Sequence, residues 1–238
     1  MKAVILAAGI ASRLRPLTNH CPKCLLKVGN KTILEHTLDN ILANGLQEIV
    51  IVTGYLELQI RDFISVRYPR LSVTYIYNEK YSTTNNIYSL WLVKEWVLGG
   101  EMLLMDSDII FDQAILTRLL GSGHDNCLAL KRHAVKEEEI KIKAGIDGRV
   151  TGIGKEILLE EAIGESIGIE KFGKDTLYKL FEIIDHKIIT GKKVNQFYEA
   201  AFQELADKGS SIYSVDVTDL KCMEIDTAED LEEAIKFI

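Results

Sequence analysis

The sequence has 238 residues, of which 47% are hydrophobic and 26% are charged, and its formal net charge is −7. No hydrophobic run reaches the ~20 residues of a membrane-spanning helix, and proteins that bind nucleic-acid backbones usually carry a basic face. We therefore expect neither a membrane protein nor a nucleic-acid-binding protein. The length favours a single domain over residues 1–238 and leaves the oligomeric state open, with a homo-oligomer among the alternatives.

Buried strands and amphipathic helices alternate along the first half of the chain. Short apolar runs predict strands at residues 2–7, 49–53, 73–77, 102–105 and 127–130. Apolar residues at three- and four-residue spacing predict helices at 33–42, 58–66 and 87–97. This alternation builds βαβ units around a mainly parallel sheet. Ligands of such sheets bind beyond the carboxyl ends of the strands, so the residues that directly follow each strand are the first site candidates.

The second half of the chain is less regular. Residues 138–143 alternate between polar and apolar, and 148–154 reads as a strand. Helices are predicted at 175–189 and 196–207, followed by a strand at 212–215 and a helix from Thr227. The opening MKAVILAAG is too short for the hydrophobic region of a secretion signal, so we expect a cytoplasmic protein.

The loop after the first predicted strand concentrates positive charge. Its small-residue turn at 7–9 lets backbone N–H groups approach a ligand closely, and Arg13, Arg15 and Lys23 follow within the same segment. In an acidic protein this loop is a candidate site for phosphate groups. The alternative is an ordinary connection between a strand and a helix whose arginines are solvated.

Two cysteines flank Lys23 in the stretch HCPKCL. A zinc site would need four ligands, and the chain has no second CxxC or HxxxH pair to supply them. A thioredoxin-like motif should follow a strand and open a helix at once, whereas Cys21 and Cys24 lie midway between the first strand and the first helix. We expect all four cysteines to be reduced.

The segments AVILAAGIASRLRPLT and PKCLLKVGNKTILEHTL resemble the signature of nucleotidyltransferases that activate sugar phosphates and alcohol phosphates. The family usually has glycine where this chain has Ala11. The resemblance covers nearly the whole chain and implies a Rossmann-like three-layer fold with a mixed, mainly parallel central sheet. It also implies that Lys23 and Arg13 are catalytic. The residues it places against the nucleotide in this first segment are Leu6, Ala7, Ala8 and Gly9.

Carboxylates follow two later segments. Asp106 and Asp108 end an apolar strand, where they suit a Mg²⁺ ion that offsets the charge of a triphosphate, although aspartate after a strand also commonly begins a turn. Asp226 precedes a helix and has Glu229 three residues on, so capping alone explains it. The resemblance implies that Asp108 and Asp226 bind the metal and that Asp106 contacts the nucleotide.

The acceptor of the transferred group is less well marked. The resemblance implies that Lys155 contacts the acceptor's phosphate and that Glu165 and Gly168 line its pocket. From the residues alone, a lysine after a strand is usually solvated, and Glu165 has the simpler role of pairing with a nearby cation.

The stretch YSTTNNIYSLW at 81–91 resembles bacterial CTP:phosphocholine cytidylyltransferases and their relatives acting on aminoethylphosphonate or inositol phosphate. The amides of Asn85 and Asn86, with Ser89, suit a pyrimidine edge, and either asparagine also suits a helix cap. A choline group is best held by aromatic faces near a carboxylate. The candidates for such a box are Tyr81, Phe172, Phe197 and Tyr198, with Glu199 or Glu224 beside them. The sequence does not choose between a quaternary ammonium, a primary amine and a polyol.

The combined expectation is a Mg²⁺-dependent cytidylyltransferase. It would transfer CMP from CTP to a small phosphorylated alcohol or phosphonate and release pyrophosphate. A hexose-1-phosphate nucleotidyltransferase using UTP or dTTP is the nearest alternative. A catalytically silent nucleotide-binding regulator and a thiol-redox protein are alternatives from other classes.

Overall fold

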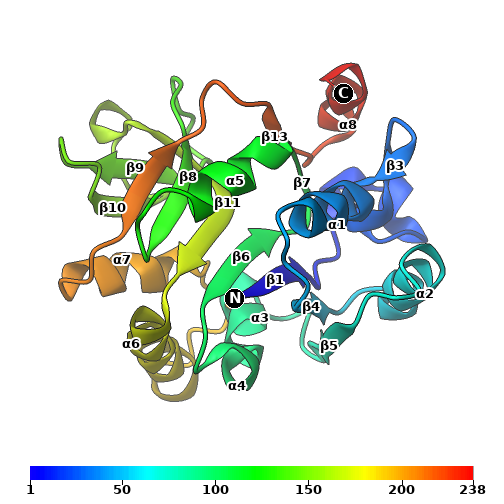
Figure 1. The fold of residues 1–238 in the computed structure, drawn as a ribbon, viewed down its shortest axis with the longest axis horizontal. Helices are drawn as coiled ribbons and strands as arrows, with labels where there is room; N and C mark the ends of the chain where they lie inside the picture. The colour runs from blue at the N-terminus through cyan, green and yellow to red at the C-terminus, as the bar shows by residue number, and fades with distance from the viewer. Residues whose placement is uncertain (238) are drawn as a thin grey trace.

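The computed structural model describes residues 1–237, which form a nine-stranded mixed sheet with helices on both faces (Figure 1). Along the sheet the strand order is β10-β9-β11-β6-β1-β4-β5, and β8 and β12 extend it from β11. Four neighbouring strands are parallel: β6 (Met102–Asp106), β1 (Lys2–Ala7), β4 (Ile49–Thr53) and β5 (Val73–Tyr77). This confirms the fold class expected from the sequence.

The remaining strands come from the second half of the chain. The longest, β11 (Gly164–Phe172), runs antiparallel to β6 and joins the parallel part of the sheet to the rest. The others are β8 (Cys127–Lys131), β9 (Lys141–Ala144), β10 (Val150–Gly154) and β12 (Tyr213–Asp216).

Helices cover each face of the sheet over a separate hydrophobic core. On one face lie α1 (Ile33–Ala43), α2 (Glu57–Arg67) and α5 (Gln113–Leu120). On the other lie α3 (Asn86–Leu92), α4 (Lys94–Val97), α6 (Lys174–Asp185) and α7 (Glu199–Asp207). Alternate residues of β1 divide between the two cores, with Val4 in one and Ile5 in the other, as expected for a strand covered on both sides.

A third, smaller core stabilises the loop after β1. It joins Leu14, Leu26, Ile110 and Ile225 with Val28, which lies in the hairpin of β2 (Lys27–Val28) and β3 (Lys31–Thr32). Strands β7 (Ile109–Phe111) and β13 (Cys222–Glu224) pair antiparallel in a separate two-stranded sheet, and β13 is followed by α8 (Ala228–Phe237). Figure 1 shows α8 beside this hairpin, across the molecule from α6 and α7.

The structure corrects several predicted boundaries. The helix expected at 87–97 divides at Val93 into α3 and α4. The helix expected at 175–189 is α6 followed by a π-helical turn at His186–Thr190. Strand β11 and helix α5 were not predicted.

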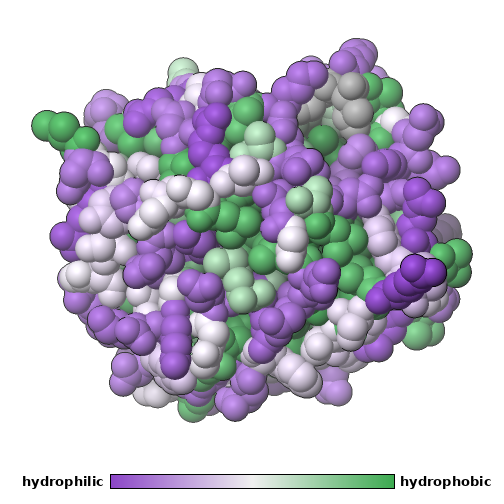
Figure 2. Space-filling view, viewed as in Figure 1, coloured by the Kyte–Doolittle hydropathy of each residue, from purple (hydrophilic) through white to green (hydrophobic). Residues whose placement is uncertain are grey.

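Hydrophilic residues cover most of the face shown in Figure 2, and hydrophobic residues gather near its middle. Among residues 1–237, no helix has the length and hydrophobicity to cross a membrane.

Candidate active site

The carboxyl ends of β1 and β6 define the site. The two strands are parallel and in register, so Leu6 lies beside Asp106 and both chains leave the sheet at the same edge. After β1 the chain enters the loop that contains Gly9, whose Cα has no heavy atom where a side chain would begin. The loop therefore leaves open space at the place where an α/β sheet binds its ligands.

Short 3-10 turns shape this loop, and hydrogen bonds hold it. The Thr18 hydroxyl donates to the Ala11 carbonyl at 2.9 Å, and the Tyr55 hydroxyl lies 3.0 Å from the Thr18 carbonyl and 2.8 Å from that of Asn19. Ala11 has a left-handed backbone with φ 51°, which explains why glycine is the usual residue at this position in the family that the sequence resembles.

Lys23 connects two distant parts of the chain. Its Nζ donates to Asp108 Oδ2 at 2.7 Å and to Asp226 Oδ1 at 2.8 Å, across 85 and 203 positions of sequence. The Lys23 side chain is 11% exposed. Burial alone would lower its pKa, but the two carboxylates outweigh that effect and raise it, so Lys23 carries its charge at neutral pH.

Asp226 is a functional candidate rather than a cap of α8. The Asp226 and Thr227 N–H groups donate to Asp230 Oδ2 at 3.0 and 2.7 Å, and the Asp230 N–H donates to the Thr227 hydroxyl at 3.1 Å. Thr227 and Asp230 thus form the cap between them. The Asp226 carboxylate instead faces Lys23 and Arg13, whose NH2 lies 2.6 Å from Asp226 Oδ2.

Three carboxylates form a candidate cation site here. Oxygen atoms of Asp108, Glu224 and Asp226 lie within 4.8 Å of one another. Burial against the site, then repulsion from Asp108 and Asp226, raises the pKa of Glu224 to about 8, although part of its surface remains exposed to solvent. Hard oxygen ligands at this spacing fit Mg²⁺. The sequence did not mark Glu224 as a metal candidate; its position two residues before Asp226 is the signal that was available.

A second acidic group lies behind Asp106. The Tyr198 hydroxyl donates to Asp106 Oδ2 at 3.0 Å. Glu170 of β11 and Glu199 of α7 are buried nearby, at 0% and 5% exposure. A Cβ on Gly168, which has φ 71°, would lie 2.7 Å from Asp106 Oδ2, so glycine is required for β11 to pass this close. Glu170 was not singled out from the sequence, because the charged residues around it hid the strand that contains it.

Asn85 and Asn86, which we expected to contact the pyrimidine base, form hydrogen bonds within the protein. Asn85 caps α3, with its Oδ1 accepting from the Asn86 N–H at 2.8 Å. Asn86 Oδ1 accepts from the Tyr198 N–H at 2.8 Å and so connects α3 to the start of α7. Ser89 Oγ accepts from the Asn78 amide at 3.1 Å. These contacts fix the α3 terminus, and the capping alternative holds for Asn85.

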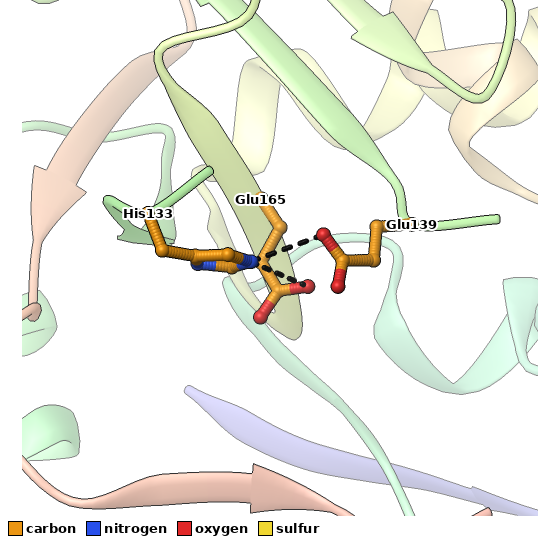
Figure 3. Close-up of side chains that lie close together, drawn as sticks. All are labelled: His133, Glu139 and Glu165. Atoms are coloured by element: carbon orange, nitrogen blue, oxygen red, sulfur yellow. Dashed lines mark hydrogen bonds and ion pairs between the residues drawn. The ribbon is translucent and has the colours of Figure 1, made fainter. Parts of the chain in front are cut away.

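The acceptor candidates from the sequence lie in two places. Lys155 Nζ lies 4.6 Å from the centre of the Phe197 ring, next to the start of α7. Glu165 instead approaches His133, whose Nε2 lies 3.0 Å from Glu139 Oε2 and 3.9 Å from Glu165 Oε2 (Figure 3). The histidine is thus the nearby partner that a purely structural role for Glu165 requires.

Comparison with known proteins identifies the family. Residues 2–138 match the family described as Nucleotidyl transferase. The chain belongs to this family. This nucleotidyltransferase is 29% identical to the choline-phosphate cytidylyltransferase of Streptococcus pneumoniae, over 99% of both chains. It is 28% identical to the CMP-5'-(3-aminopropyl)phosphonate synthase of Streptomyces rubellomurinus, over 98% of this chain but only 38% of that longer protein.

The nucleotidyltransferase fold is also found in solved structures. CTP:phosphocholine cytidylyltransferase from Streptococcus pneumoniae matches with a TM-score of 0.81 and 26% identity, over 99% of this chain and 97% of that chain. The agreement supports an enzyme rather than a regulator that has only kept the fold.

Cysteine chemistry has no support in this nucleotidyltransferase. All four cysteines are free. Cys24 is buried, and this burial is the main cause that raises the pKa of its thiol to about 12; the neighbouring Cys21 adds to the effect. Such a thiol is neither a nucleophile nor a ready metal ligand at neutral pH, so the motif around Lys23 depends on the lysine.

Proposed function

We propose that this nucleotidyltransferase transfers CMP from CTP to a small phosphorylated alcohol or phosphonate and releases pyrophosphate. The observation that carries the proposal is the bridge from Lys23 to Asp108 and Asp226, at 2.7 and 2.8 Å, at the ligand-binding edge of the sheet. The choice of CTP rests on the full-length similarity to a choline-phosphate cytidylyltransferase.

The proposed reaction is a single displacement. An oxygen of the acceptor's phosphate or phosphonate attacks the α-phosphorus of CTP, a new P–O bond forms, and the bond from the α-phosphorus to the bridging oxygen breaks. The electron pair leaves with pyrophosphate, and no side chain is attached covalently. Such a reaction needs positioning and charge stabilisation more than acid–base chemistry.

Two cations divide the charge stabilisation. Lys23, kept charged by its two carboxylate partners, is placed to stabilise the charge on the α-phosphoryl group. Arg13, 69% exposed at the loop, is free to turn toward the leaving pyrophosphate together with the N–H groups near Gly9. The ion pair of Arg13 with Asp226 is then exchanged for contacts with the nucleotide.

Asp108 and Asp226 would hold Mg²⁺, with Glu224 beside them. When bound, the ion offsets the negative charge of the triphosphate that otherwise repels the acceptor. Before the nucleotide arrives, both carboxylates share Lys23 as a positive partner, and Asp226 also has Arg13.

The test is Mg²⁺-dependent release of pyrophosphate with each of CTP, UTP, ATP, GTP and dTTP. Each nucleotide is crossed with phosphocholine, 2-aminoethylphosphonate, inositol 1-phosphate and glucose 1-phosphate. Turnover confined to CTP with a small acceptor is expected. Turnover with UTP or dTTP and glucose 1-phosphate would overturn the proposal in favour of a hexose-1-phosphate enzyme.

A pair of variants locates the activity. Asp108→Asn should abolish turnover, whereas Asp62→Asn, on the exposed surface of α2, should leave it unchanged. Equal activity of the two variants would contradict the assigned site.

A further inference from the structure

A second group of side chains with metal-ligand atoms shares no residue with the group beside Lys23. It consists of His133, Glu139 and Glu165, which each place one such atom within 4.8 Å of the others. His133 and Glu139 belong to the loop between β8 and β9, and Glu165 lies near the start of β11. Figure 3 shows the imidazole ring and the two carboxylates directed toward one another.

The spacing of these atoms suits a single metal ion. His133 Nε2 lies 3.0 Å from Glu139 Oε2 and 3.9 Å from Glu165 Oε2. Ligand atoms bound at ~2.0–2.2 Å around a tetrahedral ion lie ~3.3–3.6 Å from one another. The side chains are 31%, 18% and 23% exposed, so solvent reaches them. Small movements of these side chains would therefore let one ion contact all three.

Hydrogen bonding within the protein accounts for only one of the two carboxylates. The imidazole can donate one proton from Nε2, and Glu139 Oε2 lies at hydrogen-bond distance from that nitrogen. Glu165 Oε2 lies beyond that distance, and among residues 1–237 its carboxylate accepts no other hydrogen bond. A metal ion binds several ligands at once, so it would serve both carboxylates and the ring nitrogen together.

The lysines beside Glu165 in the sheet do not form an ion pair with it. Lys131 of β8 and Lys141 of β9 are its partners in the strand register. Their ammonium groups donate instead to the backbone carbonyls of Cys222 and Glu137, at 2.9 and 2.8 Å. In the described part of the chain, the ion-pair contact of Glu165 is thus the long one to the imidazole. Two glutamates therefore converge on one histidine, which leaves room for a further positive charge.

The ligand atoms indicate which kind of ion fits. All-oxygen sites suit Mg²⁺ and Ca²⁺, whereas an imidazole nitrogen beside carboxylates suits Zn²⁺ and related transition metals. The Lys136 N–H donates to Glu139 Oε2 at 2.9 Å, and hydrogen bonds of this kind orient carboxylates that bind a metal. Three protein ligands on an accessible surface leave a position for water.

We propose that His133, Glu139 and Glu165 bind one divalent transition-metal ion such as Zn²⁺. The ion is held by Nε2 of the histidine and one oxygen of each glutamate, with water in the remaining position. It is separate from the Mg²⁺ proposed beside Lys23 and does not depend on the choice of nucleotide or acceptor. By joining the loop between β8 and β9 to β11, the ion stabilises the folded chain.

Calorimetry of the full chain with zinc chloride tests the site. Millimolar Mg²⁺ is present throughout, so that Zn²⁺ competes with it for the all-oxygen group beside Lys23. We expect one Zn²⁺ per chain. His133→Gln should weaken this binding by more than the ~10- to 100-fold that the loss of a partner outside the ligand shell costs. Asp108→Asn should retain it.

Two control variants address other residues that could bind zinc. His186→Gln removes an exposed imidazole from the π-helical turn, and Cys21→Ser removes a partly exposed thiol. Both should bind Zn²⁺ as the unmodified protein does. Equal affinity in His133→Gln and in the unmodified protein would overturn the proposal, as would a lack of binding to the unmodified protein.

Thermal melts give a second readout that does not use turnover. Zn²⁺ at about 100 times its Kd should raise the melting temperature by ~5–10 °C in a chain of this size. The rise should disappear in His133→Gln, whose melting temperature without Zn²⁺ shows whether the variant folds. A rise that persists in His133→Gln but is lost in Asp108→Asn would place the ion beside Lys23 and refute the second site. Failure of the proposed function leaves these measurements unaffected.

Discussion

Replacing Lys23 by methionine separates its contribution to stability from its contribution to catalysis. The change keeps most of the side-chain length and removes the ammonium group that lies 2.7 and 2.8 Å from Asp108 and Asp226. The lysine is 11% exposed, and the carboxylates are 24% and 26% exposed. The variant therefore leaves two half-buried carboxylates facing each other with no cation between them except Arg13.

The expected size of the effect follows from these contacts. Hydrogen bonds to charged groups contribute about 1.5–3 kcal/mol each, but solvent reaches both carboxylates and recovers part of that loss. We expect Lys23→Met to lower the free energy of unfolding by ~2–3 kcal/mol when Mg²⁺ is absent. In a chain of this size this is a fall of about 4–12 °C in melting temperature.

The assay is a thermal melt with and without millimolar Mg²⁺, beside pyrophosphate release. Because the lysine competes for the same carboxylates, the variant should bind Mg²⁺ more tightly and regain most of its stability when the ion is added. Turnover should nonetheless fall by ~100- to 1,000-fold, as for loss of a group that stabilises charge in the transition state. Lys27→Met, at an exposed position of β2, is the control.

Two outcomes would refute this reasoning. A melting temperature of Lys23→Met equal to that of Lys27→Met would show that the bridge is energetically neutral. A loss of stability that Mg²⁺ leaves unchanged would show that the lysine and the ion do not share the two carboxylates.

Three further predictions concern other parts of the chain. Gly168→Ala should lower the free energy of unfolding by ~1–3 kcal/mol in urea denaturation, because a Cβ there lies 2.7 Å from Asp106 Oδ2 at a φ of 71°; an unchanged midpoint would contradict it. Cys21→Ser should retain full turnover, and inactivity would revive the cysteine alternative. Hydrogen bonding to Lys187 is the first cause that lowers the pKa of Glu204 from 4.5 to about 2, so its pairing stabilises the fold above pH 4.5 and is lost as the pH falls toward 2. The melting-temperature deficit of Glu204→Gln should therefore shrink from pH 7 to pH 3, and a deficit independent of pH would disprove the pairing.

The sequence predicted the parallel part of the sheet well because its strands are uniformly apolar. Strands β1, β4 and β5 have the bounds expected from their short hydrophobic runs. Strands β1 and β4 are buried on both faces, whereas β5 lies at the edge of the sheet and is only partly buried, so the pattern that marks β1 and β4 depends little on the rest of the chain.

Strand β11 was missed because its sequence breaks that rule. It contains Glu165, Glu170 and Lys171 within nine residues, and charged residues seldom lie in a central strand. Only the assembled structure shows Glu170 paired with β6 and β8 at the centre of the sheet. The local sequence pattern therefore cannot reveal a polar residue whose burial depends on strands far away in the sequence.

Some site residues were likewise identified from the sequence, and others needed the structure. Lys23 and Arg13 were identified by resemblance, and the structure brings both to Asp226. The role of Asp226 itself was open, since its contact with Lys23 spans 203 positions and its neighbours suit a helix cap. For Asn85 and Asn86 the sequence left both a contact with the base and a helix cap open. The structure shows that Asn85 caps α3 and that Asn86 accepts a hydrogen bond from the distant Tyr198 N–H.

The bridge at Lys23 has a consequence for the order of folding. Its three members come from a loop near the start of the chain, the bend between β6 and β7 near the middle, and the segment after β13. Such distant contacts form only after large loops close. During refolding, helix content should therefore return before catalytic activity, and the regain of turnover should follow the slowest kinetic phase. The chemistry of this enzyme would then report the docking of β13 onto β7.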